Sequence, residues 1–307
     1  MSNSIKVGLI WGTGTLYRDA ITAIKFHESI NNFKIKNITS RDLSGKYQYI
    51  LDYKCITKDN IKASDYDFVI VTGEDKVYDS IAQDAIEIGF KKEQLIMSRV
   101  LKNPYFDLNK YLDILKYKPT LFANNCWAGS TYNGLCLEFN SPTINLWFSD
   151  DDYFKFLKNP KYYIKQQLEL YKWEYNVTFK RNYPVCKCGD IFINFNHYKT
   201  FEEATTCWER RKKRINWDNL IIMMYTTNPE TEEKFSKLDY KKKFCFVPYE
   251  TKLKTSLYVD IDLPDKPFWW IVNRIADNKL PYYNAFDLML NGFPKKIAKT
   301  ISKSSES

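Results

Sequence analysis

Histidine is scarce in this sequence, and long apolar runs are missing. The 307 residues contain only two histidines, His27 and His197, so few side chains can supply an imidazole base. No apolar stretch approaches the about 18 residues that a transmembrane helix needs, which argues against a membrane-spanning segment. The beginning, MSNSIKVGLIWG, lacks the charged, apolar and cleavage regions of a signal peptide, so we expect a cytoplasmic protein.

Signatures of nucleic-acid binding are also absent. The sequence has no zinc finger, no RRM-like motif and no long basic stripe, and we expect no nucleic-acid partner. The net charge of +9 is partly due to KKIAKTISKSSES, which carries four lysines against one glutamate. We predict that residues 297–307 form a disordered basic tail. The remaining mild positive charge suits a sugar phosphate or a nucleotide-sugar.

Cysteine spacing provides neither a disulfide framework nor a metal site. The seven cysteines are an odd number at irregular intervals, as expected of reduced thiols in a cytoplasm. Cys186 and Cys188 form C-x-C, but no second pair or nearby histidine completes a tetrahedral set. We therefore predict no bound metal.

Strand-like and helix-like segments alternate in the first half. The apolar runs IKVGLIWG (5–12) and DYDFVIVTG (65–73) are each followed by a helical pattern. This order predicts an α/β fold, with a parallel, Rossmann-like sheet over residues 1–103. The stretch 101–119 interrupts the rhythm with two prolines, and we place a domain boundary there.

A second, less regular α/β domain is predicted over residues 104–296. TLFANN, PTINLWFS and NLIIMMYTT each read as strands, and a further strand is expected to end at His197. Ser149 and Thr200 are each followed three residues later by an acidic residue, which predicts capped helix starts. Two Asn-Pro pairs, at 159–160 and 228–229, predict further helix starts.

The turn WGTGTLY places Gly12 and Gly14 where a dinucleotide-binding fold has its phosphate turn. Tyr17 occupies the position of the third glycine in G-x-G-x-x-G. Two interpretations stay open. The glycines either allow a tight turn without a ligand, or they bind a nucleotide or nucleotide-sugar at the helix N-terminus. The cofactor is otherwise unknown from the sequence.

The stretch NNCWAG joins a predicted strand to a predicted helix and suggests a nucleophile. Cys126 falls near the helix N-terminus, where the helix dipole favours a thiolate. Asn124 and Asn125 can offer amide donors to a developing oxyanion, and Trp127 is a candidate for substrate contact. The alternative is that Cys126 is a small apolar residue packed beside Trp127.

A nucleophilic cysteine needs a base, and His197 is the better placed histidine. It ends a predicted strand before a capped helix, where parallel α/β sheets collect their ligands. His27 falls within the first helix, where a structural role is expected. Cys126 and His197 are thus the predicted catalytic residues.

The segment CWERRKKRIN predicts a phosphate-binding helix face. Arg210 and Arg214 are one helical turn apart, and two such guanidinium groups can hold a phosphate by paired hydrogen bonds. The alternative is a solvated basic face.

Four segments together carry a family resemblance: NNCWAG, SPTINLWFSDDDYFKFLKN, the DI and FNHY segment, and CWERRKKRIN. In this order they resemble a bacterial family that is catalogued as a domain of unknown function and labelled exopolysaccharide or capsule biosynthesis protein. The resemblance covers about residues 120–295. The first domain is similar to Rossmann modules of sugar-modifying proteins.

Two functional hypotheses remain open. The first is a transferase acting on an activated or lipid-linked sugar, with Cys126 and His197 at the reacting centre. The second is a non-catalytic nucleotide-sugar-binding or assembly module. An NAD-dependent oxidoreductase ranks last, because the expected Tyr-x-x-x-Lys pair beside the cofactor is missing. Self-association into a homo-oligomer is an open expectation.

Overall fold

The computed structural model describes residues 4–41, 43, 47–276 and 282–297 of the 307. The chain folds into two compact units, Met1–Lys116 and Tyr117–Ser307. The first unit therefore extends past the predicted domain of residues 1–103 and includes nearly all of the following helix. The predicted tail, 297–307, lies outside the described residues except for Ile297.

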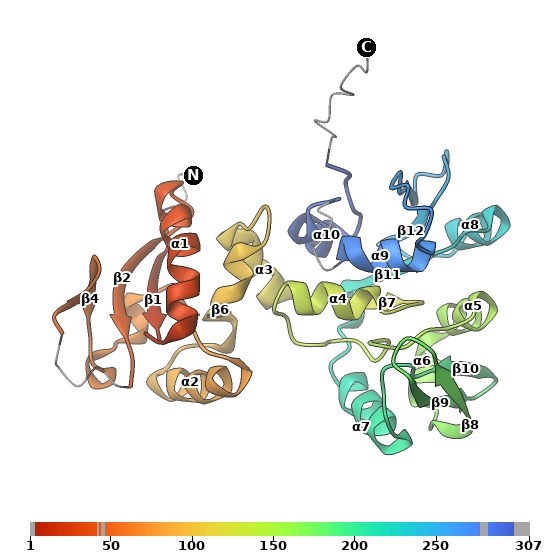
Figure 1. The fold of residues 1–307 in the computed structure, drawn as a ribbon, viewed down its shortest axis with the longest axis horizontal. Coiled ribbons are helices and arrows are strands. Elements are labelled where there is room, and N and C mark those ends of the chain that lie inside the picture. The colour runs from red at the N-terminus through yellow and green to blue at the C-terminus, as the bar shows by residue number, and fades with distance from the viewer. Residues whose placement is uncertain (1–3, 42, 44–46, 277–281, 298–307) are drawn as a thin grey trace, which may run out of the picture. The chain divides into compact units, whose positions relative to one another are not determined.

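The first unit contains a six-stranded, mostly parallel sheet in the order β3-β4-β2-β1-β5-β6 (Figure 1). Only the short β3–β4 pair is antiparallel. The strands are β1 (Val7–Trp11), β2 (Lys34–Thr39), β3 (Tyr49–Ile50), β4 (Tyr53–Cys55), β5 (Phe68–Val71) and β6 (Leu95–Met97). The helices are α1 (Thr15–Ser29), α2 (Asp75–Ile88) and α3 (Leu108–Tyr117). This is the strand order of a Rossmann-like sheet, so the predicted fold of the first half is confirmed.

Alternation along the central strands builds the first core. Leu9 and Val69 face one side of the sheet, where Ile81 and Ala85 of α2 pack against them. The intervening residues face the other side and are equally buried, and α1 lies alongside β1 and β2 (Figure 1). Both faces of the parallel sheet are thereby covered.

The second unit contains two separate sheets. The first is fully parallel, in the order β13-β12-β11-β7. Its strands are β7 (Thr120–Ala123), β11 (Leu220–Tyr225), β12 (Lys243–Val247) and β13 (Ser256–Tyr258). The second is antiparallel, in the order β10-β9-β8. Its strands are β8 (Glu169–Asn176), β9 (Arg181–Cys188) and β10 (Ile191–Asn194).

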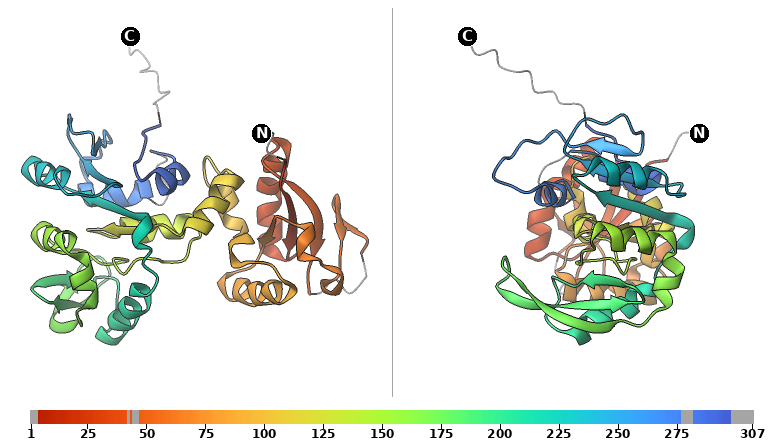
Figure 2. Two further views of the ribbon diagram at one scale, coloured as in Figure 1. Left: turned by 180° about the vertical axis from the view of Figure 1, so that it is seen from behind. Right: turned by 90° about the vertical axis from the view of Figure 1, so that its right-hand side faces the viewer.

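Seven helices are described in the second unit, and they cover these sheets (Figure 2). They are α4 (Trp127–Gly134), α5 (Asp150–Lys158), α6 (Pro160–Lys165), α7 (Phe201–Lys212), α8 (Pro229–Ser236), α9 (Phe268–Ala276) and α10 (Ala285–Asn291). Short 3-10 helices lie at Lys58–Asn60, Ala63–Asp65, Lys92–Gln94, Ser98–Lys102 and Trp217–Asn219. No helix in the described part of the chain combines the length and apolar character that a membrane crossing requires.

One buried cluster joins the two sheets of the second unit. Phe122 and Ile222 come from the parallel sheet, Cys186 and Ile193 from the antiparallel sheet, and Trp208 from α7. Cys186 and Cys188 of the C-x-C pair are both fully buried in this cluster. All seven cysteines are free thiols.

The prediction that PTINLWFS forms a strand is wrong. Only Trp147 makes a bridge, to Asn194. The Thr143 side chain takes the place of a backbone ladder, because its Oγ1 accepts from the backbone N–H of Ala123 at 3.2 Å. Asn145 has a φ of 58°, which ends any extended run.

The predicted helix starts are confirmed by their hydrogen bonds. The Ser149 side chain accepts from the N–H of Asp152, and the Thr200 Oγ1 accepts from the N–H of Glu203 at 3.0 Å. Asn159 and Asn228 cap α6 and α8 in the same way, each before a proline. These caps fix where each helix begins.

We predict that Thr200→Ala lowers the free energy of unfolding by about 0.5–2 kcal/mol, because the N–H of Glu203 loses its acceptor. Thr200→Asn retains an acceptor at the cap and is expected to be near neutral. Urea unfolding of the three proteins measures this difference, and equal losses in both variants would show that the cap bond is not the cause.

Candidate functional site

A cysteine and a histidine from distant segments meet in the second unit. Cys126 follows β7 and is the N-cap residue of α4. His197 lies in the turn between β10 and α7, three residues beyond the observed strand end at Asn194. The Cys126 Sγ is 3.1 Å from the His197 Nε2. The structure thus brings together the two residues that the sequence suggests as nucleophile and base.

Burial decides the protonation of this pair. Burial raises the pKa of the Cys126 thiol to about 12, and a hydrogen bond with Asn196 opposes this only in part. Burial also lowers the pKa of His197 below its usual 6.5, and the nearby Arg181 cation lowers it further. The raised thiol pKa runs against the expectation that the helix N-terminus favours a thiolate, because loss of water disfavours the charged form. Both shifts favour a neutral thiol beside a neutral imidazole.

Three residues next to the pair carry buried polar atoms without partners. In the part of the chain that the structure describes, Asn125 Nδ2, Asn196 Oδ1 and Arg181 Nε are buried and make no hydrogen bond. Asn125 precedes the cysteine, and Asn196 precedes the histidine. Buried polar atoms are normally satisfied, so two donors and one acceptor in these positions suit a polar ligand.

The β8–β9 hairpin supplies a side of the site that the sequence analysis missed. Arg181 Nη2 donates to the His197 carbonyl oxygen at 2.7 Å. The Phe179 ring lies 4.8 Å from the His197 ring, centroid to centroid, and the Arg181 guanidinium lies over Phe179. No local pattern marks these residues, because the hairpin folds back onto a turn that follows later in the chain.

Further missed residues stand at the carboxyl end of the parallel strands. Burial raises the pKa of Tyr225 to about 12, and the nearby Asp150 and Cys126 add to this. Burial also raises the pKa of Asp150, whose carboxylate accepts from the Thr226 hydroxyl at 3.4 Å. Ligand sites of parallel sheets lie at this edge. The sequence analysis identified candidate residues only after β7, in NNCWAG, and none at the end of β11.

Asn124 and Trp127 have structural partners in place of the predicted ligand contacts. Asn124 Nδ2 donates to the Tyr225 carbonyl at 3.0 Å, and Asn124 Oδ1 accepts from the Tyr225 N–H at 3.1 Å. These bonds occupy the amide that we expected at an oxyanion. Trp127 is fully buried, and its indole N–H donates to the Tyr283 hydroxyl at 2.9 Å.

The predicted arginine pair points to other partners. Arg210 Nη2 lies 3.6 Å from Cys207 Sγ, on the exposed side of α7. Arg214 forms an ion pair with Glu138 at 3.0 Å. The buried arginine of this helix is Arg211, which donates to the Tyr198 hydroxyl. Neither Arg210 nor Arg214 therefore has a contact that joins it to Cys126.

The glycine turn of the first unit adjoins a cavity of about 330 Å³. Gly12 has a φ of 120°, and a Cβ there would lie 2.4 Å from Thr72 Oγ1. Gly14 is the N-cap residue of α1, and a Cβ there would meet nothing within 4 Å. Tyr17 is buried in the position of the missing third glycine. Gly12 is thus required by packing, whereas Gly14 borders open space.

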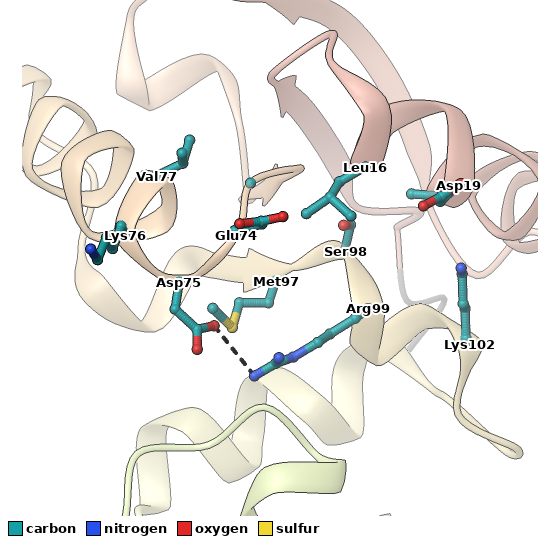
Figure 3. A pocket seen from close by; sticks show the side chains of 12 residues that line it. Leu16, Asp19, Glu74, Asp75, Lys76, Val77, Met97, Ser98, Arg99 and Lys102 are labelled. Carbon is teal, nitrogen blue, oxygen red and sulfur yellow. Dashed lines mark ion pairs between the residues drawn. The ribbon is translucent and has the colours of Figure 1, made fainter.

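A second cavity of about 720 Å³ shares Leu16, Gly73, Glu74 and Val77 with the first. Figure 3 shows its acidic and basic side chains, with Asp75 and Arg99 paired at 3.6 Å. Asp19 and Lys102 line another side. The two cavities adjoin beside the glycine turn, and their lining combines charged with apolar side chains.

No cluster of metal-binding side chains occurs among the residues with described positions. His27 is buried in the first unit, with Nε2 2.9 Å from the Leu101 carbonyl. This contact gives it the structural role that we expected.

Comparison with known proteins finds two family models. Residues 97–290 match "Domain of unknown function (DUF1919)", and residues 4–96 match "C2185-like, N-terminal". An uncharacterized protein of Haemophilus influenzae is 31% identical over 201 residues, which cover 63% of this chain and 94% of that protein. The resemblance to a family of unknown function is confirmed. Neither family description mentions polysaccharide, so a role in exopolysaccharide biosynthesis stays a prediction.

We predict that His197→Gln reduces the loss of stability in acid. A group with a lowered pKa in the folded state contributes its full stability above the unfolded pKa of 6.5, and this is lost as pH falls. The melting temperature of the wild type should therefore fall more than that of His197→Gln between about pH 7 and about pH 5. Parallel curves for the two proteins would contradict the lowered pKa of this half-buried imidazole.

Gly12→Ala and Gly14→Ala should separate the two roles of the glycine turn. The first is expected to cost about 1–3 kcal/mol, because of its positive φ and the contact with Thr72. The second is expected to cost less than about 1 kcal/mol. Thermal unfolding measures both, and equal costs would contradict the assignment.

Proposed function

Since the chain belongs to the DUF1919 family of unknown function, we propose that it is a cysteine-dependent transferase that moves an acyl group onto an activated or lipid-linked sugar. The contact of 3.1 Å between Cys126 Sγ and His197 Nε2 carries this proposal. A thiol within hydrogen-bond distance of an imidazole is the usual arrangement for nucleophilic catalysis.

The neutral pair suits a coupled attack. The Cys126 sulfur forms a bond to the carbonyl carbon of an activated acyl ester while Nε2 of His197 accepts the thiol proton. The carbonyl oxygen then carries the negative charge, and we assign its stabilisation to Nδ2 of Asn125, the residue before Cys126, which has no hydrogen-bond partner among the described residues. As the bond to the leaving group breaks, His197 returns the proton to it. A lowered histidine pKa keeps the base unprotonated at neutral pH.

The second half-reaction follows the same path in reverse. A sugar hydroxyl attacks the thioester carbon, and His197 accepts the hydroxyl proton. The carbon–sulfur bond breaks and the proton goes to the sulfur, which restores the neutral thiol. The sugar as acceptor is supported by the resemblance of four segments to proteins labelled with exopolysaccharide or capsule biosynthesis.

A nucleotide-sugar-binding role of the first unit is a second candidate. It is favoured by the adjoining cavities of about 330 and 720 Å³ beside the glycine turn. A nucleotide-sugar that binds there should raise the melting temperature by mass action. Gly14→Asp, which places a carboxylate at the open N-cap, should remove that shift, whereas no shift in the wild type would reject this role.

Cys126→Ala and His197→Ala should each abolish extracellular polysaccharide when they replace the chromosomal copy in the native host. Loss of either member of a nucleophile–base pair removes most of the rate. Cys55→Ala in the first unit is the matched control and should leave production unchanged. Normal production by both site variants, with melting temperatures showing that they fold, would remove the proposal.

A further inference from the structure

The outermost strand of the antiparallel sheet is exposed and rich in aromatic residues. β8 pairs with β9 on one side, and no described strand pairs with its other edge. Figure 1 shows β8 beyond β9 at the margin of this sheet. Its large side chains are unusually open, with exposures of 59% for Tyr171, 45% for Trp173 and 60% for Tyr175. A long exposed edge strand is a template for another strand.

The register of β8 divides its residues between two faces. Trp173 opposes Pro184, Glu174 opposes Tyr183 and Tyr175 opposes Asn182 in β9. Side chains alternate along a strand, so Trp173 and Tyr175 share one face. Lys172 and Glu174 share the other, where their charged groups are 2.6 Å apart.

The sequence of β8 is complementary to itself when read in the opposite direction. Its centre is Tyr-Lys-Trp-Glu-Tyr, residues 171–175. In an antiparallel pair centred on Trp173, Lys172 meets the partner's Glu174, and two-fold symmetry repeats that contact. The register of β8 shifts at Tyr171, between Leu170 and Lys172, so the mirrored pairing rests on residues 172–174. A centre at Lys172 or Glu174 would instead place like charges opposite each other, which destabilises a strand pair.

We propose that a second copy of this chain pairs antiparallel with the free edge of β8, about a two-fold axis at Trp173. The two three-stranded sheets then form one sheet of six strands. Such an interface is closed, because the same surface is used by both copies. The charge pattern distinguishes this occupant from a peptide or a glycan, neither of which requires opposite charges at mirrored positions.

Charge reversal tests the register directly. Lys172→Glu gives a strand with two acidic residues, and Glu174→Lys gives one with two basic residues. Each variant alone opposes like charges in the pair, and association should weaken about tenfold or more. An equimolar mixture of the two variants restores both opposite-charge contacts and should form heterodimers. The doubly reversed protein should dimerise as the wild type does.

Sedimentation velocity and native mass spectrometry measure these states. Lys234→Glu, on the exposed side of α8, makes the same charge change away from the strand and should dimerise normally. A monomeric wild type, or single variants with unchanged affinity, would overturn the proposal. So would a mixture that stays monomeric while circular dichroism shows that both variants fold.

Discussion

The contact between the Cys126 thiol and the His197 imidazole is the interaction on which the functional account depends. The two residues are 71 positions apart, yet their reacting atoms lie 3.1 Å from each other. Each follows a strand and precedes a helix, so the position of both depends on where those elements end. Asn124 secures the first of these ends, because its amide joins β7 to the backbone of Tyr225 at the end of β11.

Burial gives the pair its chemical character. It raises the thiol pKa and lowers the imidazole pKa, and both shifts favour the uncharged forms. Charge then develops only during a reaction, in a site where Asn125 and Arg181 have donors without partners among the described residues. The β8–β9 hairpin also links this site to the proposed dimer, because Phe179 and Arg181 lie beside the strand whose free edge would be paired.

Local signals in the sequence predicted much of the fold but only part of the site. Helix caps such as Thr200 could be predicted, because the side chain and the N–H that it accepts from are only three residues apart. The sequence predicted a turn at Gly12. It did not predict that Thr72 lies too close to leave room for a Cβ at this position. Other features could not be predicted, because they join segments that are not adjacent in the chain. They are the hydrogen bonds of Asn124 to Tyr225, of Arg211 to Tyr198 and of Arg181 to His197. PTINLWFS failed because its apolar pattern resembles a strand, while Thr143 and Asn145 hold it in an irregular path.

The scarcity of histidine makes the central claim directly measurable. A sample labelled with ¹⁵N in histidine contains only two imidazoles, and a His27→Asn variant assigns them. NMR titration should show that His197 stays neutral at neutral pH and protonates only below its usual pKa of 6.5, with the Cys126 thiol still protonated. An imidazolium at neutral pH beside a thiolate would contradict the neutral pair and the coupled proton transfer that depends on it.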